Sequence, residues 1–331
     1  MPRETAPREV TLLADARARA RRARDWATAD DLKAQIEAAG WNVVDTGTLY
    51  DLHRAVPPDV EVDGVLHYGG AASVPSRLGE PPVGSVSVVL VATDDAAAIA
   101  RSHAAVIANA PSVSQVVIVA NAPAEDVAAA IADIESSAPE TPPTEIVRTA
   151  RRLGHGEALN AGLRRCAAPV VLLLDPSVEV RGDLAAACAA ALADPSVAVA
   201  GPVGLVSEDL RTFEPADDAA GECDVDVIDG AAFAFRREDV EARGPLDDHF
   251  VIPAHLDTWW SLVLRDPWAI EEPVEGAPVR RAVRLASVPA VRHAGLESPV
   301  RGNQEKLEKK AFYRVLKRFA TRQDLLVANR P

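Results

Sequence analysis

The sequence predicts an α/β protein built on a mostly parallel sheet flanked by helices, with a small helical hairpin before it. Short runs rich in Val, Leu and Ala occupy residues 85–92, 113–121 and 169–174. Runs of this kind are typical of strands covered on both faces, as in a parallel sheet. Alanine-rich stretches at 95–109 and 124–135 separate them, so strands and helices alternate as in a doubly wound fold.

The stretch 144–177 is the centre of the predicted sheet domain. It reads as a strand, a glycine-bearing turn, a helix and a second strand that ends at Asp175. A further helix is expected at 183–193 and a further strand at 197–203. Ligands of open α/β sheets bind beyond the carboxyl ends of the strands. Asp175 is therefore the first candidate for a functional carboxylate; the alternative is an aspartate that only caps a turn.

The composition argues against several classes of protein. The net charge of −14 disfavours general nucleic-acid binding and a broad anionic-membrane surface, although local basic patches are compatible with it. Cys166, Cys188 and Cys223 are far apart in the sequence, which argues against a zinc cluster or a disulfide framework and fits a reducing cytoplasm. No apolar run approaches the roughly 20 residues of a membrane span, and no secretory signal is visible. We therefore expect a cytoplasmic protein.

Four segments are expected along the chain. Residues 1–48 predict the helical hairpin, 49–84 a linker with little regular structure, 85–298 the sheet domain, and 299–331 a C-terminal amphipathic helix. That helix has an apolar stripe with lysines and arginines opposite. Two interpretations stay open for it: peripheral contact with a membrane surface, or packing against the sheet domain or a partner chain. The oligomeric state does not follow from the sequence.

The N-terminal hairpin carries a recognisable pattern. An Arg-rich helix at Arg17–Arg24 is followed by Asp25–Trp26, then Ala29–Asp30, then a tail from Gly40 to Thr46. This pattern resembles the C-terminal helical segment of cysteinyl-tRNA synthetases over about 40 residues. The catalytic and zinc-binding parts of those enzymes have no counterpart in this sequence, so aminoacylation is not implied. The hairpin is either an RNA-touching or docking module or a stable helical unit reused for packing.

Six motifs follow one another in the sheet domain. In chain order they are Val86–Val91, Gly154–Gly162, Asp175–Ser177, Gly230–Arg237, Leu246–Asp248 together with Leu256–Trp260, and Val288–His293. Their order and spacing resemble the family 2 glycosyltransferases, which have the GT-A fold, a Rossmann-like fold of nucleotide-diphospho-sugar transferases. The resemblance implies a nucleotide-diphosphate sugar as donor and leaves the acceptor unknown.

The resemblance also implies a donor side of the site. Asp175 corresponds to the first Asp of the family's Asp-x-Asp motif, and Ser177 stands where the family has its metal-binding second Asp. His293 occupies the family's late-His position. Asp175 and His293 are therefore the candidate ligands for Mg or Mn, because hard oxygen and imidazole ligands suit such a metal beside a diphosphate.

Asp257 is the candidate catalytic base, because it matches the family's carboxylate that deprotonates the acceptor hydroxyl before an inverting displacement. Leu256 and Trp259 replace two acidic residues of that motif. Apolar neighbours are expected to raise the pKa of Asp257. The same apolar neighbours are equally compatible with a site that has decayed. A separate alternative is that Asp257 is only the N-cap of a helix beginning at Thr258.

The remaining donor-side candidates rest on the same resemblance. Asn121 follows the second strand and is expected at a base edge of the nucleotide, with Asp94 as an acidic substitute after the first strand. Gly154, Gly156 and Asn160 belong to the glycine segment, whose glycines suit close approach of a ligand or ordinary turn and helix packing.

Other residues leave alternatives open. His155, in the glycine segment, is expected to be a polar contact, and Arg151 and Arg152 either help hold phosphate or are surface charges. Trp259 and Trp260 form either an acceptor platform or core. The second functional hypothesis is a catalytically inactive GT-A domain that binds a nucleotide or a protein, which Ser177, Leu256 and Trp259 favour.

Overall fold

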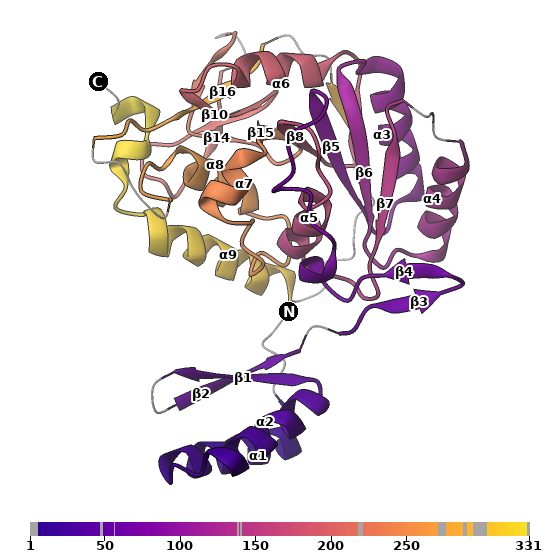
Figure 1. Ribbon diagram of the computed structural model, residues 1–331. Helices are drawn as coiled ribbons and strands as arrows, with labels where there is room; N and C mark the ends of the chain where they lie inside the picture. Colours follow the sequence, from indigo (N-terminus) through magenta and orange to yellow (C-terminus); the bar gives the residue numbers. More distant parts are fainter. Residues whose placement is uncertain are drawn as a thin grey trace. The chain divides into compact units, whose positions relative to one another are not determined.

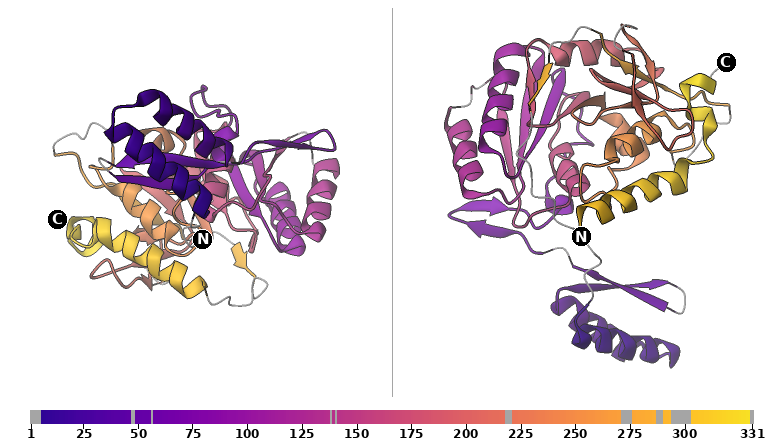
Figure 2. Two further views of the ribbon diagram at one scale, coloured as in Figure 1. Left: turned by 90° about the horizontal axis from the view of Figure 1, so that it is seen from below. Right: turned by 180° about the vertical axis from the view of Figure 1, so that it is seen from behind.

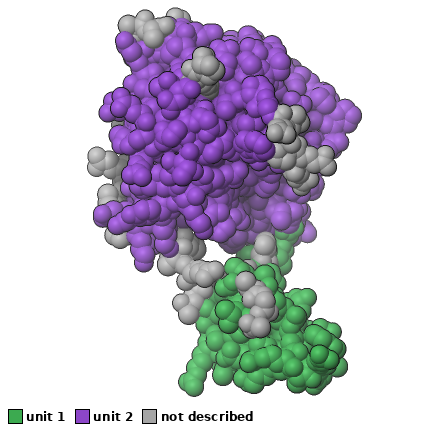
Figure 3. Space-filling view, turned by 90° about the vertical axis from the view of Figure 1, so that its left-hand side faces the viewer, with its two compact units in different colours: residues 1–60 green, residues 61–331 purple. Residues whose placement is uncertain are grey.

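The computed structural model describes residues 6–46, 49–55, 57–137, 139, 141–217, 221–270, 276–286, 290–293 and 303–329. The chain divides into two compact units, residues 1–60 and residues 61–331 (Figure 3). Parts of the predicted segments, among them residues 1–5, Val288 and residues 294–302, lie outside the described residues.

Unit 1 contains the predicted helical hairpin and a β-hairpin that the sequence analysis missed. Its elements are α1 (Arg8–Arg22), α2 (Trp26–Ala38), β1 (Trp41–Thr46) and β2 (Leu49–Arg54), with the two strands antiparallel. The Asp25 carboxylate caps α2 by accepting the N–H of Thr28. Arg17 is buried and binds both carboxylate oxygens of Asp45, at 2.8 and 2.9 Å, which joins α1 to β1.

The interpretation of residues 49–84 as a linker with little regular structure is wrong. Besides β2, the segment contains the short hairpin of β3 (Val60–Val62) and β4 (Val65–His67) and the 3-10 turn η1 (Ala71–Ser73). Its last part lies against unit 2 through backbone hydrogen bonds, from Arg77 to Arg164 and from Val83 to Ala167. Proline removes backbone donors, yet the amides of Tyr68, Arg77 and Val83 donate to carbonyls of the sheet domain.

Unit 2 is built on a mostly parallel sheet of eight strands, in the order β13-β16-β10-β15-β8-β5-β6-β7. β7, β6, β5 and β8 are parallel, β15 is antiparallel to both β8 and β10, and β16 is parallel to β10. The strands are β5 (Val86–Ala92), β6 (Val113–Ala120), β7 (Thr144–Arg148), β8 (Val170–Leu174), β10 (Val197–Gly201), β13 (Cys223–Val225), β15 (Ala232–Arg236) and β16 (Arg281–Arg284). The predicted fold class is therefore confirmed.

Helices cover both faces of this sheet, as Figures 1 and 2 show. One hydrophobic cluster joins the sheet to α3 (Ala96–Asn109), α4 (Glu125–Ser137) and α6 (Leu184–Leu192). The other joins it to α5, α7, α8 and α9, which span His155–Leu163, Glu238–Arg243, Leu256–Arg265 and Gln304–Phe319. Successive strand residues alternate between the clusters, since Val88 and Leu90 belong to one and Val89 to the other.

The remaining elements lie outside the main sheet. β11 (Gly204–Val206) pairs with β12 (Glu214–Pro215) and β14 (Val227–Ile228). β9 (Val178–Val180) pairs with β17 (Ala290–Arg292), so the described part of the predicted late strand joins β9 instead of the main sheet. The 3-10 turns η3 (Gln323–Leu325) and η4 (Val327–Asn329) follow α9. No described helix is long and apolar enough to cross a bilayer.

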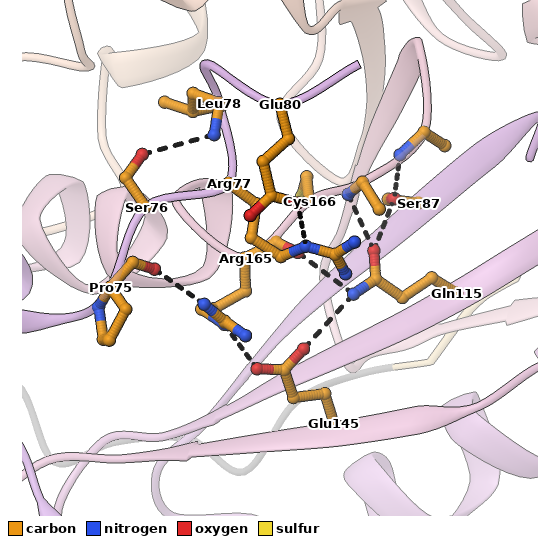
Figure 4. Close-up of polar contacts among 12 residues, drawn as sticks. Pro75, Ser76, Arg77, Leu78, Glu80, Ser87, Gln115, Glu145, Arg165 and Cys166 are labelled. Atoms are coloured by element: carbon orange, nitrogen blue, oxygen red, sulfur yellow. Dashed lines mark hydrogen bonds and ion pairs between the residues drawn. The ribbon is translucent and has the colours of Figure 1, made fainter. Parts of the chain in front are cut away.

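A polar network joins the amino-terminal ends of three neighbouring strands, β5, β6 and the edge strand β7 (Figure 4). Ser87 of β5 donates to Gln115 of β6 at 2.8 Å, and Gln115 donates to Glu145 of β7 at 3.3 Å. Arg165 completes the network, because it binds Glu145 and donates to the carbonyl of Pro75 at 2.8 Å. Because these strands are parallel, their carboxyl ends share the opposite edge of the sheet.

Candidate active site

A cavity of about 1110 Å³ lies at the carboxyl ends of β5 and β8. Its walls come from the residues after these strands, from the turn before β15 and from the start of α8. The predicted site residues that line it are Asp94, Asp175, Ser177 and Asp257. The two carboxylates singled out by the sequence, Asp175 and Asp257, therefore face one space although 81 intervening residues separate them in the chain.

Asp175 is held at the tip of β8. Its backbone N–H donates to Ala231 at 2.9 Å, and its Oδ1 accepts the N–H of Ser177 at 2.8 Å. Within the described residues this is the one hydrogen bond of the carboxylate, so Oδ2 stays available to a ligand. The turn-capping role and a functional role are compatible here, because each uses a different oxygen.

Asp257 lies in the first turn of α8. Its Oδ1 accepts the N–H of Thr258 at 2.7 Å and its Oδ2 accepts the N–H of Gly230 at 3.0 Å. Burial raises the pKa of Asp257, the two N–H donors oppose that rise, and the charge of Asp229 adds to it; the net shift is upward. The helix begins at Leu256, after His255 in a left-handed conformation (φ 64°), so the prediction of a helix start at Thr258 is wrong.

His155 lies in the first turn of α5 and lines the same cavity. Burial lowers the pKa of His155 to about 4, and the negative charge of Asp175 acts in the opposite direction. The imidazole is therefore neutral at pH 7 and can both donate and accept a hydrogen bond. The sequence placed His155 beside the glycines but gave no sign that it would be buried next to Asp175.

The charges of the cavity wall are unequal. Five carboxylates line it, from Asp94, Asp95, Asp175, Asp229 and Asp257, against two guanidinium groups, from Arg152 and Arg292. Both arginines already face carboxylates, since Arg152 donates to Asp94 at 2.8 Å and Arg292 lies 3.5 Å from Asp229. A cavity with this excess of negative charge repels an anionic ligand unless a cation accompanies it.

Asn121 and Asn160 do not line the cavity, although both were predicted to contact the donor. Asn121 is buried. Its Nδ2–H donates to the carbonyl of Leu153 at 3.1 Å, and its Oδ1 accepts the N–H of Leu153 at 2.7 Å. In the same way, the Nδ2–H of Asn160 donates to the carbonyl of Leu246 at 2.7 Å, and its Oδ1 accepts the N–H of Leu246 at 2.9 Å. Each amide is therefore used to fix a loop, and its donor and acceptor are no longer available to a ligand in this arrangement.

Gly154 and Gly156 are also absent from the cavity wall. A Cβ on Gly156 would lie 2.6 Å from the carbonyl oxygen of Asp247, and one on Gly154 would lie 3.1 Å from Cα of Val251. The N–H of Gly156 donates to the carbonyl of Phe250 at 2.9 Å. These glycines allow the start of α5 to contact the loop before α8, so they correspond to the packing interpretation and not to direct ligand contact.

His293 lies beside the cavity but is not part of its wall, which the preceding Arg292 lines. Its backbone N–H donates to the carbonyl of Ser177 at 2.9 Å, and its Nε2 lies 2.7 Å from Glu179. The hydrogen bond from His293 holds the pKa of Glu179 below its usual range, so Glu179 is ionised and Nε2 carries the proton. Nδ1 is then the nitrogen with a lone pair for a metal.

A cluster of three potential metal ligands occurs elsewhere among the described residues, at Asp247, Asp248 and His249. Asp247 binds Arg314, and His249 lies within hydrogen-bond distance of Asp247. The predicted ligand pair of Asp175 and His293 is not part of that cluster.

The two adjacent tryptophans of α8 have different surroundings. Trp259 packs between Phe250 and Phe319, with ring centroids 5.6 and 5.5 Å away, which makes it core and not an acceptor platform. Trp260 contacts Phe235 edge-on at 5.8 Å and lines the cavity. Its Nε1 is buried and has no hydrogen-bond partner among the described residues.

Comparisons with known proteins agree with this geometry. Residues 87–247 match the model of the family "Glycosyl transferase family 2". A structure of GalNAc-T7 with UDP, GalNAc and Mn²⁺ is similar with a TM-score of 0.57 and 14% identity, over 70% of this chain and 48% of that one. Mannosyltransferase PcManGT from Pyrobaculum calidifontis, in complex with GDP-Man and Mn²⁺, is similar with a TM-score of 0.51 and 19% identity, over 76% of this chain and 71% of that one.

The fold of unit 2 is that of the GT-A nucleotide-diphospho-sugar transferases. Residues 87–247, which match the model of glycosyl transferase family 2, carry most of β5, the elements up to α7 and the Asp175 wall of the cavity.

A second likeness concerns a short segment only. A cysteine–tRNA ligase from Opitutus terrae is 46% identical over 54 residues, which are 16% of this chain. The chain spans about an eighth of that relative, 12% of its length.

Proposed function

We propose that unit 2 transfers a sugar from a nucleotide-diphosphate sugar to a hydroxyl of an acceptor, with inversion at the anomeric carbon. The observation that carries the proposal is the presence of Asp175 and Asp257 on the wall of one cavity at the carboxyl edge of the sheet. The relatives of the same fold were solved with UDP or GDP-Man together with Mn²⁺. A cavity of about 1110 Å³ has room for such a donor and part of an acceptor.

Asp257 acts as the base in this proposal. The acceptor oxygen forms a bond to the anomeric carbon while its proton passes to the Asp257 carboxylate, and the bond to the nucleoside diphosphate breaks with its electron pair on the diphosphate. The raised pKa of Asp257 makes its ionised carboxylate a better proton acceptor than an ordinary aspartate. Gly230 and Thr258 fix its orientation through their N–H groups.

A divalent metal fits the charge of the cavity. Asp175 offers Oδ2, and His293 offers Nδ1 while Glu179 holds its Nε2–H, the arrangement common around metal-bound histidines. Mg or Mn held by these two groups would neutralise charge on the departing diphosphate. Because Ser177 stands in place of a second carboxylate, we expect the site to bind the metal tightly only when the diphosphate oxygens of the donor also coordinate it.

Calorimetric titration tests the donor site. UDP, GDP and dTDP are added to the full chain with and without Mn²⁺, and at least one is expected to bind more tightly with the metal. Asp175→Ala should abolish that binding, whereas Asp257→Asn should preserve it. If none of the three nucleotides binds under either condition, the transferase proposal is wrong.

A specific observation favours a second function, that of a catalytically inactive nucleotide-binding or protein-binding domain. Both oxygens of Asp257 accept backbone N–H groups, which a purely structural aspartate would also do. Under this alternative the nucleotide still binds, but the donor is neither transferred nor hydrolysed. Incubation with UDP-, GDP- and dTDP-sugars and detection of released nucleoside diphosphate distinguishes the two.

A further inference from the structure

The C-terminal helix α9 concentrates one residue type. The chain contains five lysines, Lys33 and four others, and all four of these others lie on α9. They are Lys306, Lys309, Lys310 and Lys317, each of them exposed. In a chain with a net charge of −14, this local concentration of positive charge contrasts with the rest of the composition.

The four lysines and Tyr313 form one stripe, which we call the lysine stripe. At about 100° per residue their side chains fall within an arc of roughly 100°. Tyr313 lies in the middle of the arc and is 56% exposed. The two acidic residues of the helix, Glu305 and Glu308, fall outside it. Among the described residues none of the four lysines forms an ion pair.

The opposite side of α9 is fixed to unit 2. Ala311, Val315 and Phe319 are buried in the core cluster, and Arg314 binds Asp247. The apolar stripe predicted from the sequence is therefore occupied by the protein itself, and Figure 2 shows the helix along the outside of unit 2. Because the apolar side of α9 is already buried, the exposed side of the helix can bind a partner through charge, but the helix cannot insert into a bilayer as a free amphipathic helix would.

We propose that the lysine stripe docks unit 2 on an anionic lipid surface. A straight row of lysines with one exposed tyrosine matches a flat anionic interface, because lysine heads reach the headgroups and tyrosine prefers the membrane boundary. The net charge of −14 opposes binding of the whole chain to a nucleic acid and to an anionic membrane alike, so the choice of a lipid surface rests on the flat row of lysines and its exposed tyrosine. The ring of Phe312 lies 5.6 Å from that of His255, a cavity residue, so docking through α9 holds the cavity near the surface.

Vesicle flotation tests the proposal with the full chain. Binding is expected to vesicles of phosphatidylcholine with phosphatidylglycerol, to be weak with phosphatidylcholine alone, and to fall steeply from about 0.01 M to about 1 M salt. Each lysine near the surface contributes a factor of about five, so changing all four to Gln should weaken binding about 600-fold. The melting temperature should not change, because the buried side of α9 is untouched.

A matched control removes the same charge elsewhere. The quadruple Gln variant of the exposed Arg8, Arg19, Arg22 and Arg24 should keep most of the vesicle binding. Equal loss in this control, equal binding to neutral vesicles, or no loss in the lysine variant would each overturn the proposal. So would binding of bulk tRNA that is tighter than vesicle binding and is lost in the lysine variant.

The unpartnered indole of Trp260 carries a second inference, which rests on the proposed transferase function. Trp260 is 2% exposed, lines the cavity and follows Asp257 by three positions, so the two share one face of α8. A buried N–H without a partner costs free energy, and the described residues offer it none. We infer that the Nε1–H of Trp260 donates a hydrogen bond to a hydroxyl of the transferred sugar.

The indole N–H signals of ¹⁵N-labelled protein test this directly. The chain has five tryptophans, and Trp260→Phe identifies the Trp260 signal by its loss. That signal should move on addition of the nucleotide sugar that binds but not on addition of its nucleoside diphosphate, and Trp260→Phe should lower kcat/KM by about tenfold or more. If the nucleotide sugar binds by calorimetry and the signal stays in place, this inference fails; if no nucleotide binds, the transferase proposal fails instead.

Discussion

The backbone N–H of Gly230 donates to Oδ2 of Asp257 at 3.0 Å, which joins the turn before β15 to the first turn of α8. A Cβ at position 230 would lie 3.2 Å from the Cβ of Asp257, so a glycine lets the two segments approach this closely. The candidate base is thus oriented by backbone groups of a different element. Its position depends on the fold more than on its own neighbours in sequence.

Replacement of the candidate base separates turnover from binding. Asp257→Asn keeps an oxygen for one N–H donor but cannot take a proton, so we expect turnover to fall about 10²- to 10⁴-fold while the nucleotide affinity stays within a factor of a few. Initial rates and calorimetry measure the two quantities. Asp248→Asn, at an exposed aspartate, is the matched control and should leave both unchanged. Equal turnover in wild type and Asp257→Asn would exclude the base assignment.

The partly buried His155 predicts an acid-dependent loss of stability. Its pKa is about 4 in the folded protein and about 6.5 in an unfolded chain, so between these values the unfolded state binds the extra proton. The stability contributed by neutral His155 is complete above about pH 6.5 and is lost as the pH falls toward 4.

His155→Gln does not titrate in this range. Between pH 6.5 and 4, the free energy of unfolding of wild type should therefore fall by about 3 kcal/mol more than that of the variant. Urea denaturation at several pH values measures this difference. His53→Gln, at an exposed histidine, is the control, and its free energy of unfolding should depend on pH as that of wild type does. If the free energies of unfolding of wild type and His155→Gln change with pH in parallel, the burial argument is wrong.

The sequence was sufficient for six of the eight strands of the main sheet and for the position of Asp175, because continuous apolar runs and the residues that end them are local signals; β13 and β16 were missed. It was misleading for Asn121 and Asn160, whose amides bond backbone groups 32 and 86 positions away. No local pattern reports such partners. The same reason explains why Asp229 and Arg292 were missed, since tertiary contacts bring them to the cavity.

The contact between Glu179 and His293 predicts the strength of metal binding. Glu179→Gln removes the charge that fixes the Nε2–H of His293, so the Mn²⁺ concentration needed for half-maximal nucleotide binding should rise about 10- to 100-fold. Calorimetric titration of the nucleotide at several Mn²⁺ concentrations measures it. Glu208→Gln, at an exposed position, is the control. An unchanged Mn²⁺ dependence would mean that His293 is not a ligand.

Gly162 predicts how tightly α5 packs on the sheet beneath the cavity. A Cβ at this position would lie 2.5 Å from Cγ1 of Val89 and 3.0 Å from Cγ2 of Val119. Gly162→Ala gains about 1 kcal/mol of helix propensity but overpacks the core, which typically costs about 1–3 kcal/mol. We therefore expect a net loss of about 1 kcal/mol in chemical denaturation. In a Val89→Ala background the clash is relieved, so the same substitution should become neutral or stabilising; equal losses in both backgrounds would show that the contact with Val89 is not the cause.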